Sequence, residues 1–180
     1  MRTTDGQRGP EIWIRGPVPA PESATSTPQA PGPYPPSAAT PRRFSWLGTH
    51  GGAGVSTLCA VYGGHDCGRD WPGPGDPPSV LLVARTHATG LESVLRTLDV
   101  FRRGEAPQGL DLNAIVLVAD APGRLPRQLV QRVRFIESVI DVYRVPWVQD
   151  WRLGDLGGGP PKETETLTRL TGAAVGGRVR

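Results

Sequence analysis

The sequence contains almost no lysine: Lys162 is the only one among 180 residues, against 19 arginines. It has only two cysteines, Cys59 and Cys67, which are too few for a disulfide framework and fit a reduced compartment. No segment approaches the roughly 18 apolar residues of a membrane-spanning helix, and no apolar stretch of about 7–15 residues near the start indicates a signal peptide. We therefore expect a soluble, cytoplasmic protein that does not contact membranes.

The charge balance gives weak support for nucleic-acid binding. The net charge is +3, but residues 43–153 contain 12 arginines and 11 acidic residues, so the part that we expect to fold is nearly neutral. A coding bias towards GC-rich codons explains the preference for arginine over lysine without any functional role.

The two ends of the chain differ in composition from its middle. Half of the 20 prolines fall within residues 1–41, where Ala, Ser, Thr and Gly fill most other positions. Such a segment has too little apolar surface to offset the entropy lost on ordering. We expect a disordered Pro/Ala-rich arm at 1–42 and a flexible polar tail at 154–180, with a short helix at about 162–170.

Short apolar runs alternate with helical periodicity between residues 43 and 153. The runs at 80–84 and 115–118 are continuous and bounded by turn residues, as in strands buried on both faces. Strands that alternate with helices of about 10–15 residues form right-handed βαβ units. We therefore predict a small α/β domain, with three layers around a parallel, Rossmann-like sheet. The expected strands are 44–48, 80–84, 115–118 and 141–145, the expected helices are 55–62, 91–101 and 125–139, and 63–78 is a connection.

A glycine-rich turn, residues 48–57, links the first expected strand to the first expected helix. The standard phosphate-binding loop is G-x-x-x-x-G-K-[ST], in which backbone N–H groups surround the phosphates, the lysine reaches the terminal phosphates and the hydroxyl binds magnesium. Gly48 and Gly54 have this spacing and Ser56 supplies the hydroxyl, but Val55 replaces the lysine.

The segment His50-Gly51-Gly52-Ala53-Gly54-Val55-Ser56-Thr57 resembles the deviant loop K-G-G-x-G-K-[ST]-T of the ParA/MinD class of P-loop ATPases. The glycines, Ser56 and Thr57 match, whereas His50 and Val55 replace both lysines. Residues 80–96 and 112–147 are similar to later strands and helices of that class, and its switch and Walker B segments are missing. The chain also resembles small proteins of GC-rich actinobacteria. The class resemblance implies ATP with Mg²⁺ as ligand, nucleotide-bound dimers, and roles in partitioning DNA or positioning cell machinery.

The loop supplies the first set of candidate binding residues. Losing the lysine's ionic contact costs about 2–5 kcal/mol, which corresponds to roughly 30- to 3000-fold in affinity. We therefore expect weak phosphate or nucleotide binding and no efficient hydrolysis. His50 or an arginine, Arg85 or Arg124, could replace the lysine. Alternatively, the glycines merely allow a tight turn. The candidates are His50, Gly51, Gly52, Gly54, Val55, Ser56 and Thr57.

Further candidates follow later strands, at the edge where open α/β sheets bind ligands. Arg85 follows the strand at 80–84. Asp120, in V-A-D-A-P, is either a Walker B-like aspartate or, as we favour, the cap of the next helix. Trp147, with Trp151, follows the last strand and either stacks on a base, as the resemblance implies, or packs against the sheet edge or a partner.

Three other groups give weaker signals. Cys59, His65, Asp66 and Cys67 match no zinc spacing, so we expect no metal site. Ser56, His50 and Asp120 are the residue types of a hydrolase triad, but no G-x-S-x-G turn is present. The expected face of the helix at 125–139 that bears Arg124, Arg127, Gln131 and Arg134 is either solvated or contacts an acidic partner or a nucleic-acid backbone.

The sequence thus leaves three functions open. The first is a degenerate, non-hydrolysing P-loop-like module that binds a protein partner, with no catalytic residue and no certain cofactor. The second is an unusual ATPase with ATP and Mg²⁺, in which His50 or an arginine replaces the lysine. The third is a DNA-associated accessory protein. The partner's identity and the oligomeric state are not determined by these patterns.

Overall fold

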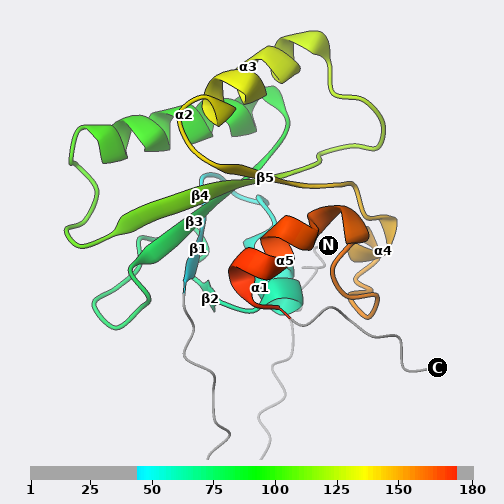
Figure 1. The fold of residues 1–180 in the computed structure, drawn as a ribbon, viewed down its shortest axis with the longest axis horizontal. Coiled ribbons are helices and arrows are strands. Elements are labelled where there is room, and N and C mark those ends of the chain that lie inside the picture. The colour runs from blue at the N-terminus through cyan, green and yellow to red at the C-terminus, as the bar shows by residue number, and fades with distance from the viewer. Residues whose placement is uncertain (1–43, 174–180) are drawn as a thin grey trace, which may run out of the picture. The chain divides into compact units, whose positions relative to one another are not determined.

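Five parallel strands form one sheet, in the order β2-β1-β3-β4-β5, in the computed structural model, which describes residues 44–173 (Figure 1). The expected α/β fold is confirmed. The arm at 1–42 and the end of the tail, 174–180, lie outside the described residues. The strands are β1 Ser45–Gly48, β2 His65–Asp66, β3 Ser79–Arg85, β4 Asp111–Val118 and β5 Val142–Val145. The helices are α1 Val55–Tyr62, α2 Ala88–Arg102, α3 Arg127–Glu137, α4 Gln149–Arg152 and α5 Glu165–Thr171, with a 3₁₀ turn, η1, at Lys162–Thr164.

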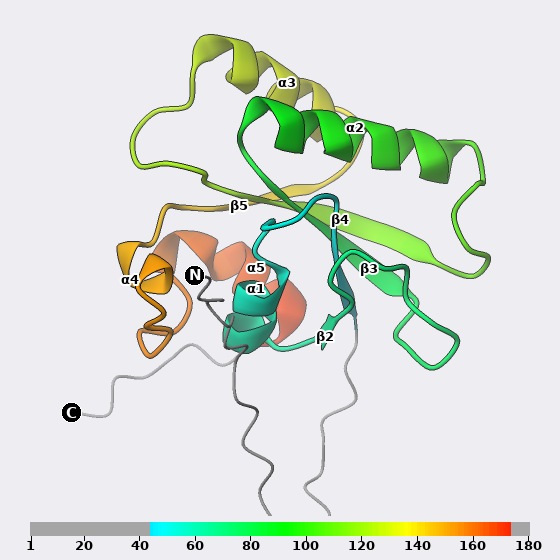
Figure 2. The ribbon, with the colours of Figure 1, turned by 180° about the vertical axis from the view of Figure 1, so that it is seen from behind.

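Helices cover both faces of the sheet, which gives the three layers. Helices α2 and α3 lie on one face, and α1 and α5 lie on the other (Figures 1 and 2). The central strands are apolar on both sides because each face is covered: Leu82 and Ile115 belong to the core under α2 and α3, whereas Val83 and Val116 belong to the core under α1 and α5. All four side chains are fully buried. The apolar runs in the sequence therefore correspond to the middle of the sheet.

The strand order changes direction at β1. From β1 the chain passes through α1 to β2, at one edge of the sheet, and then returns to β3 on the other side of β1. The order 2-1-3-4-5 is that of a doubly wound sheet, whose ligand crevice lies at the switch point, outside the carboxyl ends of the two strands. In this protein those ends are Gly48 and Arg85.

Residues 63–78, expected as a connection, contain the short strand β2. It forms because its backbone pairs with the free edge of β1. His65 N–H donates to Phe44 O at 3.0 Å, and Cys67 N–H donates to Trp46 O at 3.1 Å. Two residues are too few to produce an apolar pattern, so sequence periodicity did not reveal this strand.

The chain beyond residue 153 is more ordered than expected, because η1 and α5 pack on the sheet. Leu167 is fully buried and Thr164 is 1% exposed. The hydroxyl of Tyr62 on α1 donates to Thr164 Oγ1 at 2.6 Å. Residues 162–171 therefore belong to the folded unit, although a predominantly polar sequence predicted a flexible tail with only a short helix. Within residues 44–173, no helix has the length and apolar character needed to cross a bilayer.

Candidate functional site

The imidazole of His50 is one of the groups that connect the glycine loop after β1 to the end of β3. His50 Nε2 accepts a hydrogen bond from the backbone N–H of Arg85 at 3.0 Å. The other ring nitrogen, Nδ1, donates to Gly51 O at 2.8 Å. Because Nε2 is an acceptor, His50 is in its neutral Nδ1–H form, and both nitrogens bond to backbone. His50 therefore shapes the loop and offers no charge to a ligand in this arrangement.

Arg85 extends from the end of β3 across the glycine loop. Its Nε donates to Gly52 O at 3.3 Å and its Nη1 to Ala119 O at 2.9 Å. A Cβ at Gly54 would lie 3.6 Å from Arg85 Nη2, so the guanidinium rests against the loop backbone. Arg85 therefore connects the loop after β1 with the end of β4.

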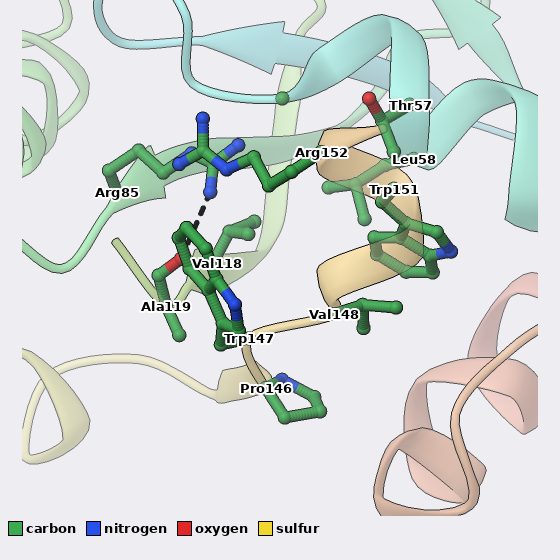
Figure 3. Close-up of a pocket in the computed structure, with 11 residues that line it drawn as sticks. Thr57, Leu58, Arg85, Val118, Ala119, Pro146, Trp147, Val148, Trp151 and Arg152 are labelled. Atoms are coloured by element: carbon green, nitrogen blue, oxygen red, sulfur yellow. Dashed lines mark hydrogen bonds between the residues drawn. The ribbon is translucent and has the colours of Figure 1, made fainter. Parts of the chain in front are cut away.

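A second arginine, Arg152 at the end of α4, approaches the first. Figure 3 shows the two side chains extending toward one another from opposite sides of a small cavity. Burial is the main cause that lowers the pKa of Arg85 from its usual range, and the positive charge of Arg152 lowers it further, while Asp120 acts in the opposite direction. The positive charges of the half-buried Arg85 and the exposed Arg152 therefore lie close enough to repel each other.

The small cavity has a volume of about 30 Å³ and lies at the carboxyl ends of β3, β4 and β5, beside the start of α1. Its volume admits about two water-sized groups. The guanidinium of Arg152 also lies 4.7 Å from the ring centre of Trp147, a cation–π contact that holds the arginine over the cavity. The lining residues are Gly54, Thr57, Leu58, Arg85, Val118, Ala119, Pro146, Trp147, Val148, Trp151 and Arg152.

The candidate residues at the start of α1 lie in different environments: one is buried, one is exposed and one lines the small cavity. Gly54 precedes the helix with φ 106°, a left-handed conformation that favours glycine. Val55, where the resembled class has lysine, is only 7% exposed and packs in the core. Ser56 is exposed, and Thr57 lines the small cavity. The side chain at position 55 therefore points into the core and does not line the small cavity.

A larger cavity, of about 540 Å³, lies between the end of the sheet, the loop before α3 and η1. Asp120 lines it, together with Arg124 and Arg144. Our preferred interpretation of Asp120 as a helix cap is wrong. Helix α3 begins only at Arg127, its N-cap residue is Pro126, and no side chain caps it. A loop with prolines at 122 and 126 postpones the helix, because proline disfavours helical geometry in the residue before it.

The structure brings together five residues that the sequence analysis named, at the small cavity: Gly54, Thr57, Arg85, Trp147 and Trp151. Arg152 was missed. The available signal was its position after Trp147 in a segment that directly follows the last strand, but only tertiary contacts bring that segment to Arg85.

Comparisons of this chain with protein-family models, with curated proteins and with solved structures gave no match.

Proposed function

We propose that this protein is a non-hydrolysing, P-loop-like binding module that holds a phosphate-bearing ligand weakly between its glycine loop, Arg85 and Arg152. The paired guanidinium groups at one small cavity carry the proposal. An anion between them would reduce their mutual repulsion and would lie near the N-terminus of α1, where the helix dipole favours negative charge. The resemblance of residues 50–57 to the ParA/MinD loop supports phosphate as the anion.

The two positions that carry lysine in the resembled class support binding without hydrolysis. Val55 is packed in the core, and both ring nitrogens of His50 are bonded to backbone. Neither residue supplies a cation to a terminal phosphate. Arg85 is held by two backbone carbonyls, at Gly52 and Ala119, so it offers only part of its hydrogen-bonding capacity to a ligand.

The larger cavity would receive the remainder of the ligand. Ala119 and Pro146 line both cavities, so the two adjoin at the ends of β4 and β5. A volume of about 540 Å³ is in the range of about 300–1,000 Å³ that is typical for small-molecule sites. We propose that a bound nucleotide or related phosphate ester orders this edge and regulates contact with a protein partner.

Calorimetric titration of the full chain with ATP, with and without Mg²⁺, and with inorganic phosphate tests the proposal. We expect affinities in the micromolar to millimolar range and at least about tenfold weaker binding by Arg152→Gln, which corresponds to about 1.4 kcal/mol. Arg134→Gln on α3 is the matched control, since it removes the same charge from an exposed residue that lines neither cavity. No binding at millimolar ligand, or equal loss in both variants, would reject the site.

The same protein samples distinguish the ATPase alternative, in which Arg85 replaces the lysine. Phosphate release above background that disappears in Ser56→Ala would establish hydrolysis and replace the binding-module proposal. We expect no such activity.

A DNA-associated role is favoured by a separate observation on α3 and the preceding loop. Arg124, Arg127 and Arg134 are exposed, and none of them forms an ion pair within the described residues. This role predicts DNA binding whose affinity falls steeply with salt and whose salt dependence decreases in an Arg127→Gln/Arg134→Gln double variant. A mobility shift that is unchanged in the double variant would exclude this face.

A further inference from the structure

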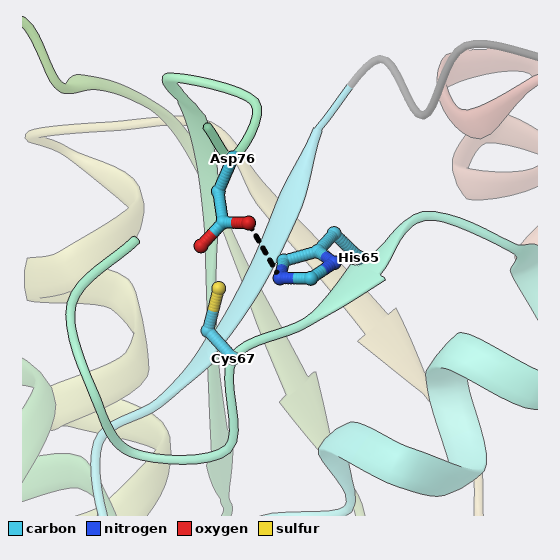
Figure 4. A group of neighbouring side chains, drawn as sticks. All are labelled: His65, Cys67 and Asp76. Atoms are coloured by element: carbon cyan, nitrogen blue, oxygen red, sulfur yellow. Dashed lines mark ion pairs between the residues drawn. The ribbon is translucent and has the colours of Figure 1, made fainter. Parts of the chain in front are cut away.

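Three potential metal ligands of different chemistry meet at the edge of the sheet beside β2. His65 is the first residue of β2, Cys67 directly follows the strand, and Asp76 lies in the loop that leads to β3. One ligand atom from each lies within 4.8 Å of the others, and His65 Nε2 is 2.9 Å from Asp76 Oδ1. Figure 4 shows the imidazole, the thiol and the carboxylate pointing toward a common centre.

The backbone explains why His65 and Cys67 meet. Residues i and i+2 of an extended strand point to the same face, and both residues are held extended by their hydrogen bonds to β1. The intervening Asp66 turns away, and its Oδ1 accepts the backbone N–H of Gly68 at 2.8 Å.

The third ligand is positioned by the loop. Asp76 Oδ2 accepts the backbone N–H of Gly73 at 2.8 Å, which leaves Oδ1 directed at His65. Prolines at 77 and 78 follow it, and Pro77 O accepts a hydrogen bond from the hydroxyl of Ser45 on β1 at 2.8 Å. The Gly73 bond thus orients the Asp76 carboxylate, and the Ser45 bond fixes the backbone that directly follows it.

We propose that His65, Cys67 and Asp76 bind one transition-metal dication of the zinc class. A thiolate, an imidazole and a carboxylate form a donor set that suits Zn²⁺ and disfavours Mg²⁺ and Ca²⁺, which prefer oxygen alone. With three protein ligands, water completes the coordination. The side chains of His65 and Asp76 are 27% and 29% exposed, so the site is open to an ion and to that water.

The geometry requires only a small closure. Tetrahedral zinc with bonds of about 2.0–2.3 Å holds neighbouring ligand atoms roughly 3.3–3.8 Å apart. The ligand atoms here span separations from 2.9 Å to at most 4.8 Å. An ion inserted between His65 and Asp76 would lengthen their contact by about half an ångström and draw Cys67 Sγ inward.

The local charge also favours a cation. Burial raises the pKa of the Cys67 thiol, a hydrogen bond with the Ser45 side chain lowers it in part, and the carboxylates of Asp76, Asp66 and Asp70 raise it further. The same negative charges attract a dication, which stabilises the thiolate and displaces the thiol proton to solvent. One Zn²⁺ ion and one thiolate, imidazole and carboxylate then leave the centre with no net charge.

The sequence led us to expect no metal site because the Cys and His residues that it placed near one another match no zinc spacing. It grouped Cys59 and Asp66 with His65 and Cys67. In the structure, Cys59 lies on α1 and its Sγ donates to Gly64 O at 3.3 Å. Asp76, and not Cys59 or Asp66, completes the cluster with His65 and Cys67. The signal within the sequence was the His-x-Cys spacing, which places two ligands on one side of a strand.

Titration of the full, untagged and reduced chain with Zn²⁺, in competition with a chromophoric chelator, tests the site. We expect one Zn²⁺ per chain. Cys67→Ser and His65→Gln should weaken binding by more than the roughly 10–100-fold that is typical for loss of an outer-shell partner. Cys59→Ser, the other cysteine, is the matched control and should bind as the natural chain does.

Co²⁺ provides a second measurement. Its complex should show a near-ultraviolet thiolate-to-cobalt charge-transfer band that persists in Cys59→Ser and is absent from Cys67→Ser. Circular dichroism of each variant without metal distinguishes loss of a ligand from loss of the fold. Failure of the natural chain to bind Zn²⁺, or dependence of the cobalt band on Cys59 and not on Cys67, would overturn the proposal.

Discussion

The imidazole of His50 accepts a hydrogen bond from the backbone N–H of Arg85 at 3.0 Å, and this bond helps to join the glycine loop after β1 to the end of β3. The bond lies at the switch point of the sheet. There the connection that leaves β1 leads to β2 on one side, and the connection that leaves β3 leads to β4 on the other side. The loop motif suggested His50 as a substitute for the lysine cation. In the structure its neutral imidazole connects the loop after β1 to β3 through hydrogen bonds to backbone. The positive charge beside the small cavity comes from Arg85 and Arg152.

Gly90 leaves room for the hydrogen bond between His50 and Arg85, and Gly90→Ala should disrupt this bond. A Cβ at Gly90 would overlap Arg85 O and lie 3.1 Å from His50 Nε2. Because the obstacle is backbone, the helix must shift, and we expect a loss of about 1–3 kcal/mol in the free energy of unfolding. Urea denaturation measures it, with the exposed Thr89→Ala in the same helical turn as control. Equal stability of Gly90→Ala and the natural chain would contradict this packing.

Restoring the lysine of the resembled loop at position 55 should lower the stability of the protein. Val55 is 7% exposed in the core under α1, so Val55→Lys places an unpaired ammonium there, at a cost on the order of 3 kcal/mol. Ser56→Lys, at the exposed neighbouring position, is the control and should be nearly neutral. Thermal unfolding and ATP titration of both variants provide the measurement. A Val55→Lys variant that stays stable and gains tight ATP binding would show that position 55 faces the ligand.

Helix α5 should contribute to global stability. Leu167 is fully buried among the side chains that α1 packs against, so Leu167→Ala should cost about 2–5 kcal/mol. Leu170, on the same helix and 36% exposed, provides the control, since Leu170→Ala should cost much less. Urea unfolding compares the two. Equal, small effects would mean that α5 does not dock on the sheet in solution.

Stability should fall in alkaline solution because of Tyr62. Burial raises the pKa of Tyr62 above its usual value, and its hydrogen bond to Thr164 lowers the pKa only in part. The folded state therefore holds the phenol proton more tightly than the unfolded state does. The stabilisation from Tyr62 is fully present below the ordinary pKa of about 10 and is lost as pH rises through the higher folded-state pKa.

Urea midpoints measured from neutral to strongly alkaline pH test this effect. Tyr62→Phe should cost about 1 kcal/mol at neutral pH, because it removes the bond to Thr164, and it should flatten the alkaline decline. Tyr143→Phe leaves the Tyr62–Thr164 pair intact and should retain the decline. An unchanged decline in Tyr62→Phe would assign the effect to other groups.

The sequence by itself determined the class of fold and most of its elements. Continuous apolar runs at 80–84 and 115–118 indicate strands covered on both faces. The spacing of Leu129, Val133 and Ile136 indicates a helix that covers one face of the sheet. These patterns depend on the period of each element, which neighbouring residues determine. The glycine loop was recognisable for the same reason, as a local turn between a strand and a helix.

Only the tertiary structure decided what those elements bring together. Strand β2 forms because its backbone pairs with the edge of β1. Helix α5 is partly buried because Leu167 packs in the same core as the apolar side chains of α1. The meeting of Arg85 with Arg152, and of His65 and Cys67 with Asp76, depends on strand order and loop closure. Such contacts join residues distant in sequence, whose proximity is set by the packing of the whole sheet, and no local periodicity records them.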